Sequence, residues 1–406
     1  MDSLWRSRDL QLVGGARAVS VFGDEVALVA LLMHTHDFGL GPFAVTGLLV
    51  AFAVPTVAMA GLAGRLVDRY DSRVLCVASS LWQAVACLAL AVAPQQGWFG
   101  AGVTYALVVV LQVGNAVALP TWQALVPEIV GDDRLGKAMG DLQALATAAG
   151  VAGPAVGGML VAGPGFTWAM VVNSLTFGLL ALAGLAVGVR RLPQAHEASP
   201  SDDGAGRRAG GLALLRADRL LWSLVTGLLA LVVVAEGSNV AEVFLVRDTL
   251  QASPAAFGYL QAVLALGMFA GSLAAGGLDG EVARLRAVLL ALAGLSLALL
   301  IGSRAPSVAV LAVCWLGMGI GMAMVNAGAQ TLVIQRTPAE RRGRVVATFM
   351  GLARAGSVVA LGLGGLATSV FSPRTVFALA GAAALVAAAV TAARTAPFWR
   401  ARAVPR

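Results

Sequence analysis

Residues 64–73 read Gly-Arg-Leu-Val-Asp-Arg-Tyr-Asp-Ser-Arg and lie between two long apolar stretches. Five charged residues fall within nine positions here. On either side the chain runs for about 20 residues with almost no charge, which is the length that crosses a bilayer as a helix. The pattern predicts a membrane protein in which this short charged segment does more than join two spans.

The composition excludes an ordinary soluble domain. Of the 406 residues, 59% are hydrophobic and only 12% are charged, whereas soluble domains carry about 25% charged residues. The net charge of +7 is spread over short segments without a basic, aromatic-rich patch, so no nucleic-acid partner is expected. The three cysteines lie in apolar stretches and lack metal-ligand spacing, so we expect neither a metal site nor a cofactor.

Apolar windows of about 20 residues predict an all-α membrane protein with twelve transmembrane helices. The expected spans are 11–33, 41–63, 74–93, 99–120, 138–161, 166–189, 220–246, 255–277, 286–303, 307–328, 345–369 and 374–394.

The positive charges predict the orientation of these spans. With the N-terminus inside the cell, 23 of the 28 Lys and Arg residues fall in inside segments and three in outside loops, namely Arg247, Arg304 and Arg374. Positive residues concentrate on the cytoplasmic side of membrane proteins. We therefore expect a multi-pass protein of the cell inner (cytoplasmic) membrane with both termini in the cytoplasm.

An internal repeat divides the spans six and six. Gln123-Ala-Leu-Val, Asp133-Arg-Leu-Gly-Lys and Gly157-Gly158 recur as Gln330-Thr-Leu-Val, Glu340-Arg-Arg-Gly-Arg and Gly364-Gly365, always 207 residues later. Residues 190–219 form the longest polar stretch, flexible from Pro193 to Gly211. We predict two pseudo-symmetric six-helix halves, 1–189 and 220–406, joined by a cytoplasmic linker at 190–219.

Four segments resemble the major facilitator superfamily of transporters, and within it the drug, macrolide and enterobactin efflux branch. They are Ser20-Val-Phe-Gly-Asp24, the 64–73 segment, the 123–138 segment and Gly153-Pro-Ala-Val-Gly-Gly158. The resemblance covers essentially the whole chain. It implies alternating access of the two halves around a site near the midplane, small-molecule and proton partners, and a monomer in the lipid bilayer.

The same resemblance implies roles for two groups of residues. In the 64–73 segment, Asp68 would hold the halves together with Arg69 and Arg73, while Gly64 would allow a close helix contact. In the fifth span, Pro154 would permit a bend, and Gly153, Gly157 and Gly158 would permit close packing. The sequence departs from the family pattern where Asp71 replaces a glycine, where Ser72 replaces a basic residue, and at 109–115, which lacks the arginine of many proton-coupled exporters.

Charged side chains inside spans are costly and are functional candidates by default. The candidates for proton coupling are Asp24, Glu25, Glu236, Glu242, Arg17 and Arg354. We expect Asp24 and Glu236, from the first span of each half, to face a central cavity and carry protons, with an arginine pairing the deprotonated form. Structural ion pairs inside the bundle are the alternative, and Glu242 is close enough to the outer end to be solvated beside Arg247.

Polar residues in the spans are candidates for substrate binding: Gln112, Asn115, Asn239, Asn326 and Gln330. They could equally bond neighbouring helices. The leading prediction is a secondary active transporter that exports amphipathic small molecules, a drug or a secondary metabolite such as a siderophore, by proton antiport. An uptake permease, a membrane enzyme and a non-transporting sensor remain alternatives. An enzyme is disfavoured because no catalytic constellation occurs at matching depths. No ATP-binding loop is present, so we do not expect ATP to be the direct energy source of transport.

Overall fold

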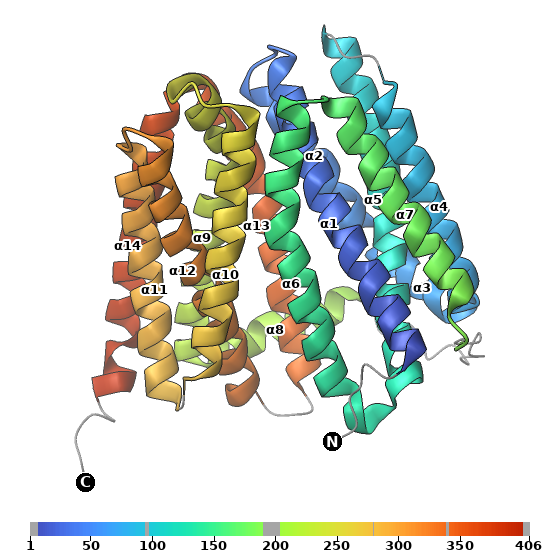
Figure 1. The fold of residues 1–406 in the computed structure, drawn as a ribbon. Helices are drawn as coiled ribbons and strands as arrows, with labels where there is room; N and C mark the ends of the chain where they lie inside the picture. Colours follow the sequence, from blue (N-terminus) through green and yellow to red (C-terminus); the bar gives the residue numbers. More distant parts are fainter. Residues whose placement is uncertain (1–6, 94–96, 190–203, 279, 338–340, 401–406) are drawn as a thin grey trace. The chain divides into compact units, whose positions relative to one another are not determined.

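The computed structural model describes residues 7–93, 97–189, 204–278, 280–337 and 341–400. All regular secondary structure within these ranges is helical (Figure 1). The helices before the interrupted linker are α1 (Arg8–Asp37), α2 (Pro42–Ala58), α3 (Ala60–Arg69), α4 (Ser72–Ala91), α5 (Gly97–Val130), α6 (Asp132–Ala162) and α7 (Phe166–Ala186). Those after it are α8 (Gly204–Ala217), α9 (Arg219–Phe244), the π-helical segment η2 (Leu245–Thr249), α10 (Pro254–Gly276), α11 (Glu281–Ser303), α12 (Val308–Arg336), α13 (Arg342–Val370) and α14 (Pro373–Arg400).

The expected membrane architecture is confirmed, since each predicted span lies almost entirely in helix. By length and apolar composition, ten described helices can cross a membrane, and the bent pair of α2 and α3 makes an eleventh. Helix α1 is 30 residues long but contains Arg17, Asp24 and Glu25. Large apolar side chains on the spans are exposed, for example Val85 at 65% and Leu290 at 73%, as lipid-facing surfaces require.

Helix boundaries follow local chemistry. The Asp71 side chain accepts a hydrogen bond from the backbone N–H of Arg73 at 2.7 Å and starts α4. The Asp218 side chain accepts from the N–H groups of Leu220 and Leu221 and starts α9. Such caps satisfy the N–H groups that have no partner in the first turn of a helix. Helices α6 and α11 instead follow Gly131 and Gly280, whose φ values of 73° and 82° favour glycine.

The chain divides into two compact units. The first comprises Met1–Glu197 and Ala252–Ala262, and the second comprises Ala198–Gln251 and Val263–Arg406. Within the first unit, α1 packs between α6 and α7, and α4 packs against α5 and α7 (Figure 1). Hydrogen bonds cross between its helices: the Trp82 indole donates to the Val110 carbonyl, and the Tyr105 hydroxyl to the Ala44 carbonyl, both at 2.7 Å.

The packing of α1 against α6, the first and fifth spans of the first half, is repeated in the second unit by α9 and α13. Helix α9 packs on α13 and α14, while α11 packs on α12 and α14. A Cβ added at Gly157 of α6 would lie 2.8 Å from the Val26 carbonyl oxygen of α1. A Cβ added at Gly364 of α13 would overlap the Gly237 carbonyl oxygen of α9. The two glycines paired by the sequence repeat therefore have the same task, a close backbone contact with the first helix of their own half.

The predicted linker differs from expectation in its second part. Residues 190–203 lie outside the described residues, but 204–217 form α8, where a flexible chain was expected as far as Gly211. Helix α8 packs on α9 and α13, and Leu215 is fully buried there. Helix-forming Ala, Leu and Arg residues with an apolar face outweigh the glycines in this segment.

We predict that Gly364→Val lowers the thermal stability of the purified protein, because the new side chain must push α13 away from α9. Overpacking of this kind costs about 1–3 kcal/mol. Gly362→Val on the same helix is the matched control, since a Cβ there meets no atom within 4 Å in the described structure. Thermal unfolding in detergent should show a clear loss only for Gly364→Val. Equal melting temperatures for the two variants would contradict the close contact.

Candidate functional site

Asp24 lies in the middle of α1 and is engaged by its own unit. The Asn173 side chain of α7 is hydrogen-bonded to Asp24, and Arg17, two turns earlier on α1, acts on it through its positive charge. Asn173 is fully buried; its amide donates to Cys87 Sγ of α4 at 3.5 Å, and its oxygen accepts from Thr176 at 3.1 Å. The carboxylate is therefore the centre of a polar cluster between α1, α4 and α7.

Gly23 explains why α7 reaches Asp24. A Cβ at Gly23 would collide with Thr176 and with the oxygen of Asn173. Only a residue without a side chain lets the polar face of α7 approach the helix so closely. In the first span, Gly23 thus permits the close approach of α7, and the adjacent Asp24 receives the hydrogen bond that this approach makes possible.

Glu25 points to a different neighbour from Asp24. A Cβ at Gly153 of α6 would lie 2.6 Å from the Glu25 Cβ and 2.8 Å from the Phe22 carbonyl oxygen. The stem of Glu25 therefore packs on α6, about 100° around the helix from Asp24. Gly158 faces the other side of α6, where an added Cβ would lie 2.6 Å from the Pro254 carbonyl oxygen of the first turn of α10, inside the same unit. Pro154 lies between Gly153 and Gly158 within an uninterrupted α6.

Glu236 is the corresponding carboxylate of the second unit. It is half-buried on α9 and accepts hydrogen bonds from Ser357 Oγ of α13 at 3.2 Å and from Asn239 Nδ2 at 3.0 Å. Each unit therefore joins the carboxylate of its first helix to a second helix through a neutral hydrogen-bonding side chain. Arg354 lies on α13, one turn before Ser357, and is exposed.

The suggestion that Glu242 is solvated was wrong. Glu242 is 5% exposed, and its carboxylate accepts a hydrogen bond from the Trp315 indole of α12 at 2.7 Å. Trp315 is fully buried and stacks on Phe377 of α14, with ring centroids 5.7 Å apart. Burial of the carboxylate is compatible with its chemistry because the indole N–H supplies a hydrogen bond.

The 64–73 segment is mostly helical. Gly64, Asp68 and Arg69 lie in α3, and only Tyr70 and Asp71 separate it from α4. Gly64 is exposed, and a Cβ there would meet no described atom within 4 Å, so the expected close helix contact is not made in this structure. Asp71, which departs from the family pattern, is the residue that caps α4.

Arg73 binds the end of α7. Its guanidinium donates to the carbonyl oxygens of Gly184 at 3.2 Å, of Leu185, and of Val187 at 2.6 Å. Asp9 of α1 accepts from the N–H groups of Gly188 and Val189, both at 3.1 Å. A cation at the last carbonyls of a helix satisfies groups that lack helical partners. Together Arg73 and Asp9 hold the backbone where the chain leaves the first unit.

The candidate substrate-binding residues are divided between the two units. Gln112 and Asn115 are neighbours on α5, and the Asn115 amide donates to the Gln112 oxygen at 3.1 Å. Gln112 is buried, whereas Asn239 of α9 and Asn326 and Gln330 of α12 are exposed. Their part in binding stays a prediction. Among the residues that the structure describes, no group of three His, Cys, Asp or Glu side chains is arranged to hold a metal ion.

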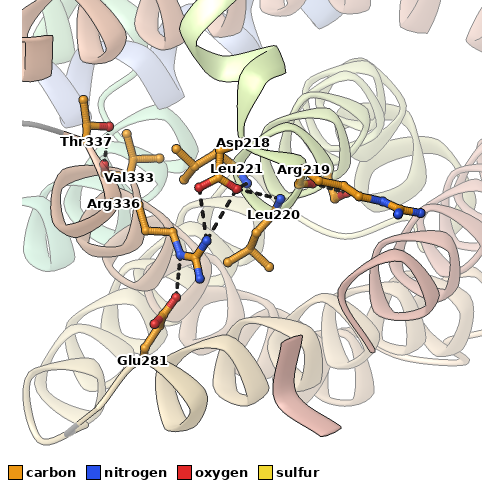
Figure 2. A network of polar contacts seen from close by, with 9 residues as sticks. Asp218, Arg219, Leu220, Leu221, Glu281, Val333, Arg336 and Thr337 are labelled. Atoms are coloured by element: carbon orange, nitrogen blue, oxygen red, sulfur yellow. Dashed lines mark hydrogen bonds and ion pairs between the residues drawn. The ribbon is translucent and has the colours of Figure 1, made fainter. Parts of the chain in front are cut away.

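A charged network in the second unit was missed at the sequence level. Arg336, at the end of α12, donates to Glu281 of α11 and to Asp218 of α9, the latter at 3.1 Å (Figure 2). Burial lowers the pKa of Arg336, but the hydrogen bonds and negative charges of Glu281 and Asp218 outweigh burial and raise the pKa above its usual value. The guanidinium also lies 5.6 Å from the Phe398 ring centre, within cation–π range. One arginine thus ties together the ends of three helices and braces a fourth.

Comparison with known proteins identifies the class. The family model described as Major Facilitator Superfamily matches residues 13–246 and again 237–405. The chain therefore belongs to the major facilitator superfamily, a multi-pass membrane transporter family.

Individual relatives are distant. The chain is similar to the "uncharacterized MFS-type transporter YfiS" of Bacillus subtilis (strain 168), at 22% identity over 88% of this chain and 86% of that protein. Its fold is similar to a bacterial homologue of the iron transporter ferroportin in an inward-facing state, with a TM-score of 0.75 at 16% identity over 97% and 100% of the two chains. A mutant of the nucleoside transporter NupG gives a TM-score of 0.75 at 10% identity over the same shares.

We predict that Arg336→Ala destabilises the protein by about 2 kcal/mol, because the charge-assisted hydrogen bonds to Asp218 and Glu281 are lost. Arg336→Lys should recover only part of the loss, since a single ammonium cannot reproduce the planar fork of donors. Chemical or thermal unfolding measures the effect. Arg304→Ala, at an exposed position, is the control. Unchanged stability in Arg336→Ala would show that the network contributes nothing.

Proposed function

We propose that this transporter exports amphipathic small molecules, a drug or a secondary metabolite, in exchange for protons. The observation that carries the proposal is the pair of carboxylates, Asp24 on α1 and Glu236 on α9. Each is partly buried in the middle of a span and is bonded to a second helix of its own unit, through Asn173 or Ser357. Charged groups at such positions are expensive and usually serve transport.

The coupling step follows from elementary electrostatics. A deprotonated Asp24 is stabilised by Arg17 and by the hydrogen bond with Asn173. Protonation removes its negative charge, and so weakens the attraction to Arg17 and the contact between α1 and α7. A proton therefore changes how tightly the first helix is held in its bundle. Alternating access requires that kind of change to bias one conformation over the other.

Export, rather than uptake, is supported by the Gly153–Gly158 motif and its resemblance to drug antiporters. Gly153 and Gly157 fit α6 tightly against α1, and Gly158 fits it against the start of α10. A helix sealed on two sides by backbone contacts is suited to closing one side of a pathway. For the protein as a whole we propose a monomer in the inner membrane with cytoplasmic termini, and halves at 1–189 and 220–406 that move against each other.

The test measures substrate-triggered proton movement in vesicles loaded with a pH-sensitive dye. Lipophilic cations, macrolides and siderophore-like compounds are added to wild type, Asp24→Asn and Glu236→Gln. We expect at least one compound to trigger proton flux in the wild type, and at least one of the two substitutions to abolish that flux. The sign of the flux relative to compound movement separates proton antiport, as proposed for the exporter, from proton symport, as in an uptake permease.

Glu128→Gln is the matched control, since Glu128 is an exposed carboxylate on α5. It should leave the flux unchanged. Compound movement with normal proton coupling in both Asp24→Asn and Glu236→Gln would place the coupling group elsewhere. Compound movement without any proton flux in the wild type would overturn proton antiport itself.

A further inference from the structure

A polar stripe on α4 lies inside the first unit. Cys76, Ser80, Gln83 and Cys87 follow one another at spacings of four, three and four residues, and all are buried. Residues at these spacings share one face of a helix. The stripe faces α7 at both ends: a Cβ at Gly184 would lie 3.4 Å from the Cys76 Cβ, and the Asn173 amide bonds Cys87.

A second polar stripe lies on α1, and α7 packs against both α1 and α4. Arg17, Ser20 and Asp24 share one face of α1 at spacings of three and four. Asn173 of α7 touches both stripes at one level, because its amide bonds Cys87 and a Cβ at Gly23, next to Asp24, would overlap its oxygen. Ser20 and Gln83 each lie about one helical turn before that level on their own helix.

Ser20 and Gln83 both carry a buried polar atom with no partner. Their exposures are 0% and 1%, and among the described residues neither Ser20 Oγ nor Gln83 Oε1 makes a hydrogen bond. The neighbouring serines of α4 differ, because Ser80 donates to the Cys76 carbonyl and Ser79 to the Leu75 carbonyl. Buried polar groups are nearly always satisfied, and bound water is the usual partner where protein atoms do not serve.

We propose that Ser20 and Gln83 bind internal water between α1 and α4, and that this water gives Asp24 access to solvent protons from within the first unit. The water site lies between Asp24 and the end of the bundle at which Asp71 caps the start of α4. A proton released by the Asp24 carboxylic acid passes to the bound water and leaves an anion that Arg17 stabilises. Proton access for Asp24 rests on the proposed function, whereas the water site itself does not.

Cys87 offers a reporter for this water that does not depend on transport. In a variant with Cys76→Ala and Cys314→Ala, Cys87 is the sole thiol. Its S–H stretching band in the infrared shifts to an S–D band after transfer to D₂O, at a rate set by how readily water reaches the thiol. We expect Ser20→Ala with Gln83→Met to slow this exchange by about tenfold or more, since water loses the hydrogen bonds that hold it there.

Ser79→Ala is the matched control, because its hydroxyl is already bonded within α4; it should leave the exchange rate unchanged. Ser20→Ala alone is a smaller change and should slow the thiol exchange less than the double variant does. This single variant provides the test if the double variant fails to fold. An exchange rate that is the same with and without Ser20 and Gln83 would overturn the water site.

Proton flux separates this inference from the proposed function. If the substitutions at Ser20 and Gln83 slow hydrogen–deuterium exchange of the Cys87 thiol while Asp24→Asn keeps normal proton flux, the water site stands and the role of Asp24 fails. If Asp24→Asn abolishes proton flux while the thiol exchange rate is unchanged by the substitutions at Ser20 and Gln83, the transport role stands and the water site fails. If the water site and the role of Asp24 are both correct, the double variant Ser20→Ala with Gln83→Met, which keeps Asp24, should also slow the substrate-triggered proton flux.

Discussion

Close contact between helix backbones is the constraint on which the rest of the structure depends. Lipid chains are as apolar as the side chains of the spans, so burial of apolar surface does little to draw one span to another. What remains is packing and the few hydrogen bonds that cross between helices. Gly23, Gly153, Gly157 and Gly364 provide the packing, and each opens a place where a second helix touches α1 or α9. The first span of each half is thus held by close contacts with its neighbours.

That close packing decides which charges can be tolerated. Asp24 is accepted in α1 because Gly23 admits the polar face of α7, and Glu242 is accepted in α9 because an indole N–H reaches it. At the ends of the helices a different chemistry holds the bundles together. Arg73 and Asp9 bind backbone groups of opposite polarity at the end of α7, and Arg336 joins Asp218 to Glu281. Neutral side chains thus bond Asp24 and Glu236 in the middle of their spans. The charged networks of Arg73, Asp9 and Arg336 lie at helix ends, where water lowers the cost of charge.

The spans were well predicted from the sequence, because the thickness of the bilayer requires about 20 apolar residues in each and such runs stand out in the hydropathy pattern. The repeat also pairs Gly157 with Gly364, and the structure shows that both make a close backbone contact with the first span of their own half. Contacts between helices far apart in the chain could not be predicted from the sequence. Nothing in the sequence around Asn173, Trp315 or Arg336 says which carboxylate each will meet, since that depends on how the helices rotate and slide. One signal was available: Asp218 lies two residues before an apolar run, as a helix cap does, and Arg336 lies two residues after one.

The bonds at the end of α7 and the start of α9 have a consequence for the chain as a polymer. Arg73 and Asp9 fix the backbone through Val189, and the cap at Asp218 fixes the start of α9, with every partner supplied by the same unit. Neither set of bonds needs the covalent connection between Val189 and Gly204. Dividing the gene at that point into two reading frames would therefore leave intact the bonds that fasten the chain on each side of the cut.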